Sequence, residues 1–300
     1  METIKNLALI KEVYEQGGNI IKYLKNTNQE TDNSPESILI SYDFQAGTYT
    51  ENYKKNKKFV QQYGAMIATT IEKYLDTVES IIEVGVGEAT TFSNVLRALK
   101  NKPKNCYGFD ISWSRIKYAN SFLKKEKLKN CFLFVGDLFN IPLKDNSIDI
   151  VYTSHSIEPN GGKEKEAVME LFRIAKNYVI LLEPCYELAS NEAKDRMRMH
   201  GYITNMQKVI EELNYDIKEF RLFDLCSNPL NPTGLTVIQK NCNSNSKVET
   251  PLACPISKTD LSLLKGSYFS KESLLAYPII NNIPCLLPNN AIVATHYTDK

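Results

Sequence analysis

The sequence predicts an α/β fold: a seven-stranded, mostly parallel sheet that ends in an antiparallel hairpin, followed by a small C-terminal α+β module. Between residues 79 and 184, short apolar runs alternate with amphipathic stretches, which is typical of parallel strands joined by crossover helices. Two further apolar runs follow residue 215, and the Pro- and Asn-rich connector between them is too short for a crossover helix. These two runs are therefore expected to pair antiparallel.

The apolar runs place the strands, and the amphipathic stretches between them place the helices. Sheets of this type bind ligands at the carboxyl ends of their strands, where the strand order reverses. Functional residues are therefore expected directly after each strand. The parallel strands are expected at residues 80–84, 106–110, 131–135, 148–153 and 178–183, the hairpin strands at 216–224 and 234–239, and two of the helices at 91–99 and 115–123.

Composition divides the chain into four parts. Residues 1–60 have mostly helical patterns and include a polar, Tyr-rich segment at 41–53. Residues 61–240 hold the sheet. The polar, aperiodic stretch 241–249 is interpreted as a linker, and residues 250–300 as a second, smaller module.

Charge and cysteine content restrict the class of protein. The 36 basic and 35 acidic residues give a net charge of +1, which argues against an extended nucleic-acid surface or an anionic membrane as partner. The seven cysteines are scattered and form no C-x-x-C pair, which suits free thiols in a reducing compartment. No apolar stretch reaches the roughly 18 residues of a membrane span, and no secretion signal is visible. We therefore expect a cytoplasmic protein.

Polar residues follow the first two expected strands. The chain reads Glu83-Val-Gly85-Val-Gly87 after the first, and the glycines allow a tight turn in which a ligand contacts the main chain; an ordinary strand-to-helix turn is the simpler interpretation. The carboxylate of Glu83 favours a cationic ligand over a pyrophosphate. Asp110 ends the second strand, where a carboxylate accepts ribose hydroxyls in such folds. Asp110 and Ser112 also suit a helix cap.

Asp137 and Leu138 follow the third expected strand. An aspartate at this position is suited to accept a hydrogen bond from the exocyclic amine of adenine, while Leu138 packs on the ring. A surface turn is the competing explanation.

The sequence resembles the class I S-adenosylmethionine-dependent methyltransferases over residues 60–240, in the terminal hairpin and in the motifs Glu83-x-Gly85-x-Gly87, Asp110 and Gly136-Asp137-Leu138. The resemblance implies a Rossmann-like fold with the glycine turn under the methionine moiety of the cofactor, Asp110 on its ribose and Asp137 on its adenine. Ala89 departs from the third glycine of many members. The cofactor-binding residues that the resemblance implies are Tyr49, Glu83, Gly85, Gly87, Asp110, Ile111, Asp137, Leu138 and Ser154.

The loop after the fourth strand, residues 154–162, is expected to face both cofactor and acceptor. It lacks the Asn/Asp-Pro-Pro-Tyr tetrapeptide with which many members of the family position a planar nitrogen, so methylation of nucleic-acid bases and of glutamine is disfavoured. A hydroxyl acceptor needs a base, and His155 is the catalytic residue expected to supply it, with Glu158 orienting His155 or holding the acceptor. A packed structural histidine is the alternative.

Basic residues after the fifth strand are candidates for binding the acceptor. Arg196, Arg198 and His200 fall where related enzymes often carry acceptor-capping elements, and with Tyr42 they are predicted to bind substrate; a solvated helix face explains the basic residues equally well. An acceptor that is already anionic needs no base. The tyrosines of residues 41–53 are expected either to close over the cofactor as a lid or to pack as an amphipathic segment.

Residues 250–288 are similar to the small zinc-ribbon-like domain that partners and activates several methyltransferases of tRNA and translation factors. Two cysteine pairs bind zinc in that domain. Here Cys254 remains, but Ser257, Ser270 and Ser273 stand at the other three positions, and neutral hydroxyls do not replace thiolates in a tetrahedral zinc site. We expect no metal, and a degenerate module that packs on the larger domain or supports a subunit contact.

Together these features predict a methyltransferase that uses S-adenosylmethionine to methylate an oxygen of a small polar or anionic metabolite, or of a building block of a surface glycan such as a capsule. Residues 41–47 resemble methyltransferases that decorate capsules, including those acting on phosphoramidate or phosphate precursors. The fused module leaves a second possibility, methylation of a translation-related protein or tRNA. The loss of the cysteines leaves a third, a scaffold that binds the cofactor without turnover. The expected partner is a small-molecule acceptor, and a homodimer is left open.

Overall fold

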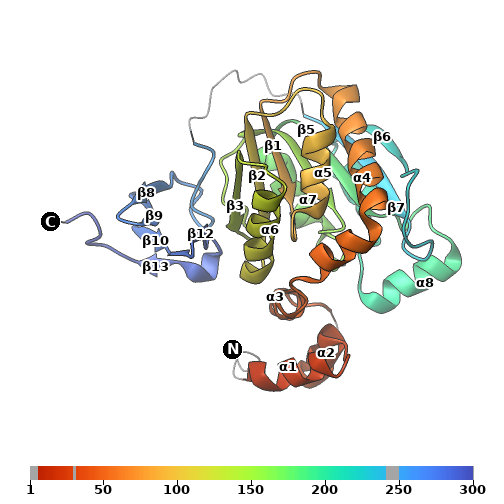
Figure 1. Cartoon of the computed structure of the whole chain (residues 1–300), viewed down its shortest axis with the longest axis horizontal. Helices are drawn as coiled ribbons and strands as arrows, with labels where there is room; N and C mark the ends of the chain where they lie inside the picture. The colour runs from red at the N-terminus through yellow and green to blue at the C-terminus, as the bar shows by residue number, and fades with distance from the viewer. Residues whose placement is uncertain (1–5, 30–31, 241–249, 300) are drawn as a thin grey trace.

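The computed structural model describes residues 6–29, 32–240 and 250–299, so the linker expected at 241–249 and Cys242 within it lie outside the described residues. The strands of its central sheet are β1 (Ser80–Val84), β2 (Asn105–Asp110), β3 (Cys131–Val135), β4 (Ile148–Ser154), β5 (Ala175–Pro184), β6 (Asp216–Leu222) and β7 (Thr233–Gln239). They lie in the order β3-β2-β1-β4-β5-β7-β6, parallel except for β7, which is antiparallel to both neighbours (Figure 1). The predicted fold class is confirmed.

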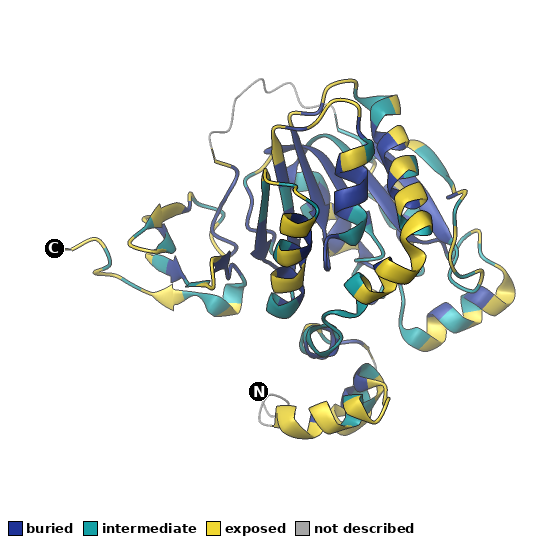
Figure 2. Cartoon of the chain, viewed as in Figure 1, coloured by how far each residue is buried: buried dark blue, intermediate teal, exposed yellow. Residues whose placement is uncertain are grey.

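Helices cover both faces of this sheet. The α-helices of the described residues are α1 (Leu7–Glu15), α2 (Ile20–Asn28), α3 (Pro35–Phe44), α4 (Thr48–Tyr74), α5 (Thr90–Ala98), α6 (Trp113–Lys125), α7 (Glu164–Ile174), α8 (Asn191–His200) and α9 (Met206–Glu212). Of these, α1 and α2 pack with α3 in a small apolar cluster of their own, away from the sheet (Figure 1). The apolar cluster on one face draws on α4, α5 and α6, and the cluster on the other draws on α7 and α9. Because both faces are covered, adjacent residues Ile81 and Ile82 of β1 are both fully buried. Figure 2 shows the strands at the centre of the sheet in the dark blue of buried residues.

Helix α3 and the start of α4 reach the carboxyl ends of the strands (Figure 1). The start of α3 follows from local sequence, because the Ser34 side chain accepts a hydrogen bond from the Ser37 amide and Pro35 occupies the first helical position. A short turn then leads into α4, which runs across residue 60 and packs on α5. Residues 42–50, the end of α3 and the start of α4, are thereby held above the sheet edge.

The C-terminal unit, residues 250–299, is built from small antiparallel sheets. Four strands, β8 (Ser262–Leu264), β9 (Ser267–Ser270), β10 (Leu275–Tyr277) and β13 (Ile292–Val293), form one sheet in the order β13-β10-β9-β8, and β11 (Ile279–Ile280) pairs with β12 (Ile283–Pro284). The helical part of this unit is one 3-10 turn, Pro288–Asn290.

This C-terminal unit covers the outer edge of the central sheet at β3 (Figure 1). The Leu286 amide donates to the carbonyl of Val135 at 2.9 Å, and Cys285 forms a parallel bridge with the same residue. The Lys144 amide donates to the carbonyl of Pro251 at 2.8 Å on the chain that follows β3. Unpaired edge strands invite association with other chains, so this contact protects the edge.

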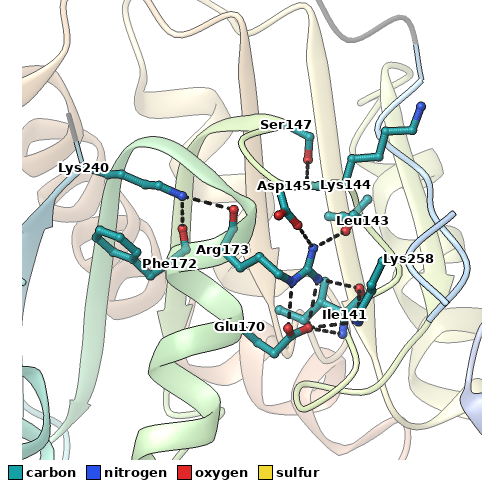
Figure 3. Close-up of polar contacts among 10 residues, drawn as sticks. All are labelled: Ile141, Leu143, Lys144, Asp145, Ser147, Glu170, Phe172, Arg173, Lys240 and Lys258. Carbon is teal, nitrogen blue, oxygen red and sulfur yellow. Dashed lines mark hydrogen bonds and ion pairs between the residues drawn. The ribbon is translucent and has the colours of Figure 1, made fainter. Parts of the chain in front are cut away.

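Ionic contacts reinforce the same interface (Figure 3). The Arg173 guanidinium donates to both carboxylate oxygens of Glu170, at 2.7 and 2.9 Å, and to the carbonyl oxygen of Ile141 at 2.9 Å. From the C-terminal unit, the Lys258 ammonium donates to that carbonyl and to Glu170, each at 3.2 Å. The network joins α7, the chain after β3 and the C-terminal unit.

Within the described ranges, no helix combines the length and the apolar character needed to cross a bilayer. The described cysteines are free thiols.

Candidate active site

A cavity of about 790 Å³ lies at the carboxyl ends of β1 to β4, beneath residues 42–50. The ends of parallel strands converge there, as expected where the strand order reverses on either side of β1. Ten of the residues singled out in the sequence line it, namely Tyr42, Tyr49, Gly85, Gly87, Asp110, Ile111, Asp137, Leu138, Ser154 and His155.

The glycine turn after β1 is shaped by positive φ angles and close contacts. Gly85 has φ +70°, and a Cβ atom there would lie 2.2 Å from the Cβ of Ser156. Gly87 has φ +53°. Ala89, where many relatives carry a third glycine, adopts φ +59° and precedes α5. Side chains are therefore excluded at Gly85, which leaves the main chain of the turn facing the cavity.

Asp110 ends β2 and braces the glycine turn. One of its carboxylate oxygens accepts a hydrogen bond from the Gly87 amide at 3.0 Å, and the other accepts from the Ser112 amide at 2.9 Å. The N-terminal cap of α6 is Ser112, whose hydroxyl accepts from the Arg115 amide at 3.1 Å, and not Asp110. Asp110 is thus free of the capping role that the sequence left open.

Asp137 shapes the loop after β3. Its carboxylate accepts hydrogen bonds from the Phe139 amide at 3.0 Å and from the side-chain amide of Asn140 at 2.8 Å. Leu138 lines the cavity beside it. Asp137 therefore forms the turn and also lines the cavity, so both interpretations of this residue hold.

Glu83 is the one predicted cofactor residue that the structure does not bring to the cavity wall. Its side chain is buried behind the wall and accepts a hydrogen bond from the Tyr152 hydroxyl at 2.6 Å. Burial raises the pKa of Glu83 to about 8, against the opposing effect of the Tyr152 hydrogen bond. Glu83 therefore lies behind the cavity wall, hydrogen bonded to Tyr152, and does not line the cavity itself.

Glu88, which the sequence did not single out, fastens residues 42–50 to the glycine turn. It is completely buried, and its carboxylate accepts hydrogen bonds from the amides of Gly47 at 2.8 Å, Tyr49 at 3.2 Å and Thr50 at 2.7 Å. These amides belong to the start of α4, where N–H groups have no partner within the helix. In the sequence, the only sign of this contact is a glutamate directly after Gly87.

Arg115 is the second residue that the sequence did not single out. It projects from the first turn of α6 into the cavity, is 1% exposed, and donates through Nε to the carbonyl of Tyr42 at 3.0 Å. Its guanidinium carbon lies 4.9 Å from the ring centre of Tyr42 and 4.2 Å from that of Tyr49. The Nη2 atom is buried and has no hydrogen-bond partner. The Nη1 atom lies 3.9 Å from a carboxylate oxygen of the buried Glu88, which balances the charge. The unused Nη2 donor is suited to a hydrogen-bond acceptor of a ligand, such as a carboxylate.

Other contacts hold residues 42–50 in the same place. Asp43 accepts hydrogen bonds from the hydroxyls of Ser112 at 2.6 Å and Ser114 at 3.0 Å. Tyr53 does not join the cavity wall: it is buried and packs edge-on against Phe122. Of the three tyrosines considered for a lid, Tyr42 and Tyr49 therefore line the cavity, and Tyr53 packs under α6.

His155 follows β4 and is hydrogen bonded at both ring nitrogens. Nδ1 lies 2.6 Å from a carboxylate oxygen of Glu158, and Nε2 lies 2.8 Å from the Thr233 hydroxyl. Burial lowers the pKa of His155, but the hydrogen bond and charge of Glu158 outweigh burial and raise the pKa overall. Glu158 thus orients the ring as expected, and it does so from behind the cavity wall.

Glu183, at the end of β5, organises the loop that carries His155. Its buried carboxylate accepts hydrogen bonds from the amides of Ser156 at 3.0 Å, Ile157 at 3.2 Å and Glu158 at 3.1 Å. The left-handed φ of His155, +56°, is maintained by these contacts.

The three basic residues of α8 that were expected to bind substrate have different surroundings in the structure. Arg198 is exposed and bonds Asp195 and the Tyr186 hydroxyl, so it reaches no cavity wall. His200 lines a second, neighbouring cavity together with Tyr42. Arg196 lies with its guanidinium carbon 5.7 Å from the ring centre of Tyr202, and its Nη1 atom is buried without a partner.

The four positions compared with zinc ligands do come together in the C-terminal unit. The Ser257 amide and the Ser273 hydroxyl donate to the sulfur of Cys254, at 3.4 and 3.7 Å. Thr259 bridges the hydroxyls of Ser257 and Ser270, at 2.7 and 2.6 Å. Hydroxyl and thiol hydrogen bonds therefore occupy the centre of this cluster.

Comparison with known proteins agrees with this architecture. A family model described as a methyltransferase domain matches residues 75–247, more than half of the chain. Norajmaline N-methyltransferase of Rauvolfia serpentina is 30% identical in an alignment of 113 residues that covers 30% of this chain and 38% of the relative. The chain thus matches under two fifths of the length of that curated relative.

Two solved structures share the fold. One belongs to the complex between the Haloferax volcanii Trm112 methyltransferase activator and a methyltransferase, with a TM-score of 0.52 and 14% identity over 69% of this chain and 100% of that chain. The other is magnesium protoporphyrin IX methyltransferase of Synechocystis PCC 6803 with bound S-adenosylhomocysteine, with a TM-score of 0.51 and 13% identity over 67% and 99%. With the matched family model, these findings show that the chain belongs to the S-adenosylmethionine-dependent methyltransferases.

Proposed function

We propose that this protein transfers the methyl group of S-adenosylmethionine to a hydroxyl oxygen of a small anionic acceptor. Sugar building blocks of a surface glycan such as a capsule, and phosphate or phosphoramidate precursors, belong to this class. The observation that carries the proposal is the cavity in which the glycine turn, Asp110 and Asp137 lie together with His155, the residue suited to take a proton from a hydroxyl.

The residues of the cavity fit this cofactor. The excluded side chain at Gly85 leaves main-chain atoms of the turn open to the methionine moiety. Each carboxylate oxygen of Asp110 accepts one main-chain hydrogen bond and keeps acceptor capacity for a ribose hydroxyl. Asp137 and Leu138 would bind the adenine by hydrogen bonding and packing, with Ile111 on the same wall.

Arg115 is assigned to the carboxylate of the cofactor's amino-acid moiety. A guanidinium with an unused donor in a buried site binds a carboxylate through strong, charge-assisted hydrogen bonds. Arg115 also bonds the Tyr42 carbonyl and lies over the Tyr49 ring, so the same side chain joins ligand binding to the position of residues 42–50.

When bound, S-adenosylmethionine supplies an electrophilic methyl group, so the protein has to align the acceptor and remove its proton. His155 is assigned as the base. Glu158 holds Nδ1, and Nε2 takes the proton once the acceptor hydroxyl replaces the Thr233 hydroxyl that bonds it in this structure. The raised pKa makes His155 a stronger base for this proton.

A methyl-transfer assay tests this proposal. The full chain is incubated with S-adenosylmethionine and a panel of sugar phosphates, nucleotide sugars and uronic acids, and release of S-adenosylhomocysteine is measured. We expect release above the acceptor-free blank with at least one of them, and a loss of about 10²- to 10⁴-fold in His155→Gln with cofactor affinity unchanged. Cofactor binding without release would reject the acceptor class, and undiminished turnover in His155→Gln would reject the base.

The C-terminal unit supports a second candidate, an enzyme of the translation apparatus with a fused activator. In favour of it, one similar structure comes from a complex with the Trm112 activator, and residues 250–299 pair with the sheet edge at β3. Residues 154–162 lack the tetrapeptide suited to planar nitrogen acceptors, so we rank this candidate second. Transfer to a translation factor or tRNA in the same assay would reverse the order.

A further inference from the structure

A second cavity adjoins the candidate cofactor cavity and shares Tyr42 and Pro159 with it. It is an open groove of about 1630 Å³ between α2, α3 and the end of α8. Tyr42 stands between the two spaces, and His200, one of the residues expected to bind substrate, lies in the groove. A molecule in this groove would reach the cofactor cavity past Tyr42 and Pro159.

The groove is positively charged. Lys22 and Lys25 lie three residues apart on α2, and both line it. The lining contains no aspartate or glutamate. Neither lysine forms an ion pair with any residue in the described part of the chain. Two unneutralised ammonium groups on one wall favour an anionic ligand.

Asn33 supplies an independent sign of a ligand. It is 7% exposed and lines the groove, and its side-chain N–H group donates to the carbonyls of Pro159 at 2.9 Å and His200 at 3.1 Å. Its side-chain oxygen is buried and accepts no hydrogen bond. A buried acceptor without a donor is costly unless a ligand or a water provides one, and a hydroxyl group is suited to do so.

Two aromatic rings also line the groove. The rings of His200 and Tyr202 stack with centres 5.2 Å apart and an angle of 25° between planes. Flat apolar faces beside amide groups suit the C–H face and the hydroxyls of a sugar ring. The groove therefore combines recognition of hydroxyls, a ring face and an anion.

We propose that this groove binds the acceptor, and that the acceptor is a sugar carrying a phosphate. The phosphate lies at Lys22 and Lys25, a sugar hydroxyl donates to Asn33, and the hydroxyl to be methylated passes Tyr42 and Pro159 toward His155. This assignment rests on the proposed methyl transfer and adds to it the place and class of the acceptor.

The test is calorimetric titration of the full chain saturated with S-adenosylhomocysteine, so that failure of the cofactor site appears first, as a lack of S-adenosylhomocysteine binding. The probes are glucose 6-phosphate and UDP-glucose, with glucose and inorganic phosphate for comparison. The variant Lys22→Ala/Lys25→Ala removes the charge, and Lys11→Ala/Lys54→Ala, whose lysines pair with Glu15 and Glu51 outside the groove, is the matched control.

We expect one phosphorylated probe to bind at least tenfold tighter than glucose and than inorganic phosphate. The groove variant should lose at least tenfold of that affinity, while the control variant and the affinity for S-adenosylhomocysteine stay within twofold of wild type. Equal binding by the groove variant and the control, or no binding of either phosphorylated probe to the loaded protein, would overturn the assignment. Inorganic phosphate binding as tightly as the sugar phosphates would reject the sugar.

Discussion

The carboxylate of Glu88 accepts a hydrogen bond from the main-chain amide of Thr50 at 2.7 Å, which joins the glycine turn to the first turn of α4. Gly47 and Tyr49 donate to the same carboxylate. A negative side chain at this position satisfies free helical N–H groups and interacts favourably with the helix dipole. The ligand turn and the segment above it thus form one hydrogen-bonded structure.

Replacing Glu88 should uncouple these two parts. In Glu88→Ala three amides lose their acceptor, so we expect unfolding free energy to fall by about 2 kcal/mol and the affinity for S-adenosylhomocysteine to fall about tenfold. Denaturant unfolding and calorimetric titration measure the two effects. Glu51→Ala, which removes an exposed carboxylate on the same helix, is the control and should change neither. Wild-type cofactor affinity in a destabilised Glu88→Ala protein would contradict the coupling.

The role of Arg115 can be tested with a cofactor that lacks the carboxylate, the group that Arg115 is assigned to bind. Wild type should bind S-adenosylmethionine about 10- to 100-fold tighter than decarboxylated S-adenosylmethionine, because a hydrogen-bonded carboxylate is lost. Arg115→Met should weaken S-adenosylmethionine binding and abolish this preference. If the variant weakens both ligands equally, Arg115 acts only by holding Tyr42 and Tyr49 in place.

The state of His155 can be measured directly, because the chain has only three histidines. Histidine ring resonances followed by NMR against pH should show one titration above the usual value of about 6.5, assigned by its absence in His155→Gln. Glu158→Gln keeps an oxygen for Nδ1 but removes the charge that raises the pKa, so the titration should move to lower pH. An unchanged titration in Glu158→Gln would remove Glu158 from this role.

The pair of His155 and Glu158 also predicts how the free energy of unfolding changes with pH. Because the pKa of His155 is raised in the folded state, its pairing with Glu158 stabilises fully below about pH 6.5, and that contribution is lost as pH rises through the raised pKa. The difference in unfolding free energy between wild type and Glu158→Gln should therefore shrink at alkaline pH.

Arg173 tests whether the ionic network beside the C-terminal unit supports the cofactor cavity. The unit and Arg173 together hold Val135 and Ile141, which flank the loop of Asp137. Arg173→Met should lower unfolding free energy by about 3 kcal/mol, since Glu170 loses its main partner, and should speed hydrogen exchange in the loop. Arg221→Met, a surface ion-pair variant elsewhere, should cost under about 1 kcal/mol. Unchanged exchange in Arg173→Met would show that this network does not support the Asp137 loop.

The parallel sheet could be predicted from sequence because its strands are buried on both faces. All five residues of β1 are buried, and the expected range agrees with the observed one. Residues 175–177 of β5 were missed because Lys176 and Asn177 are polar and interrupt the apolar run. The terminal hairpin followed from the short connector alone.

The site was predictable only where local sequence carries the signal. Gly85 and Asp110 sit at strand ends, so their positions follow from the strands. Glu88 and Arg115 act on residues 42–50, some 40 to 70 positions earlier in the chain, and no local pattern reports such a contact. Arg198 was expected near the acceptor, but its pairing with Asp195 on the outer face of α8 turns it away.

Calorimetric titration with S-adenosylmethionine and S-adenosylhomocysteine, on wild type, Asp110→Asn and Asp110→Ala, tests the central claim most directly. Wild type should bind both ligands, and Asp110→Ala should lose at least tenfold in affinity, with Asp110→Asn in between, because charged acceptors bond hydroxyls more strongly than neutral ones. Melting of the ligand-free proteins checks that all three are folded. No binding by folded wild type, or equal binding by folded Asp110→Ala, would contradict the account.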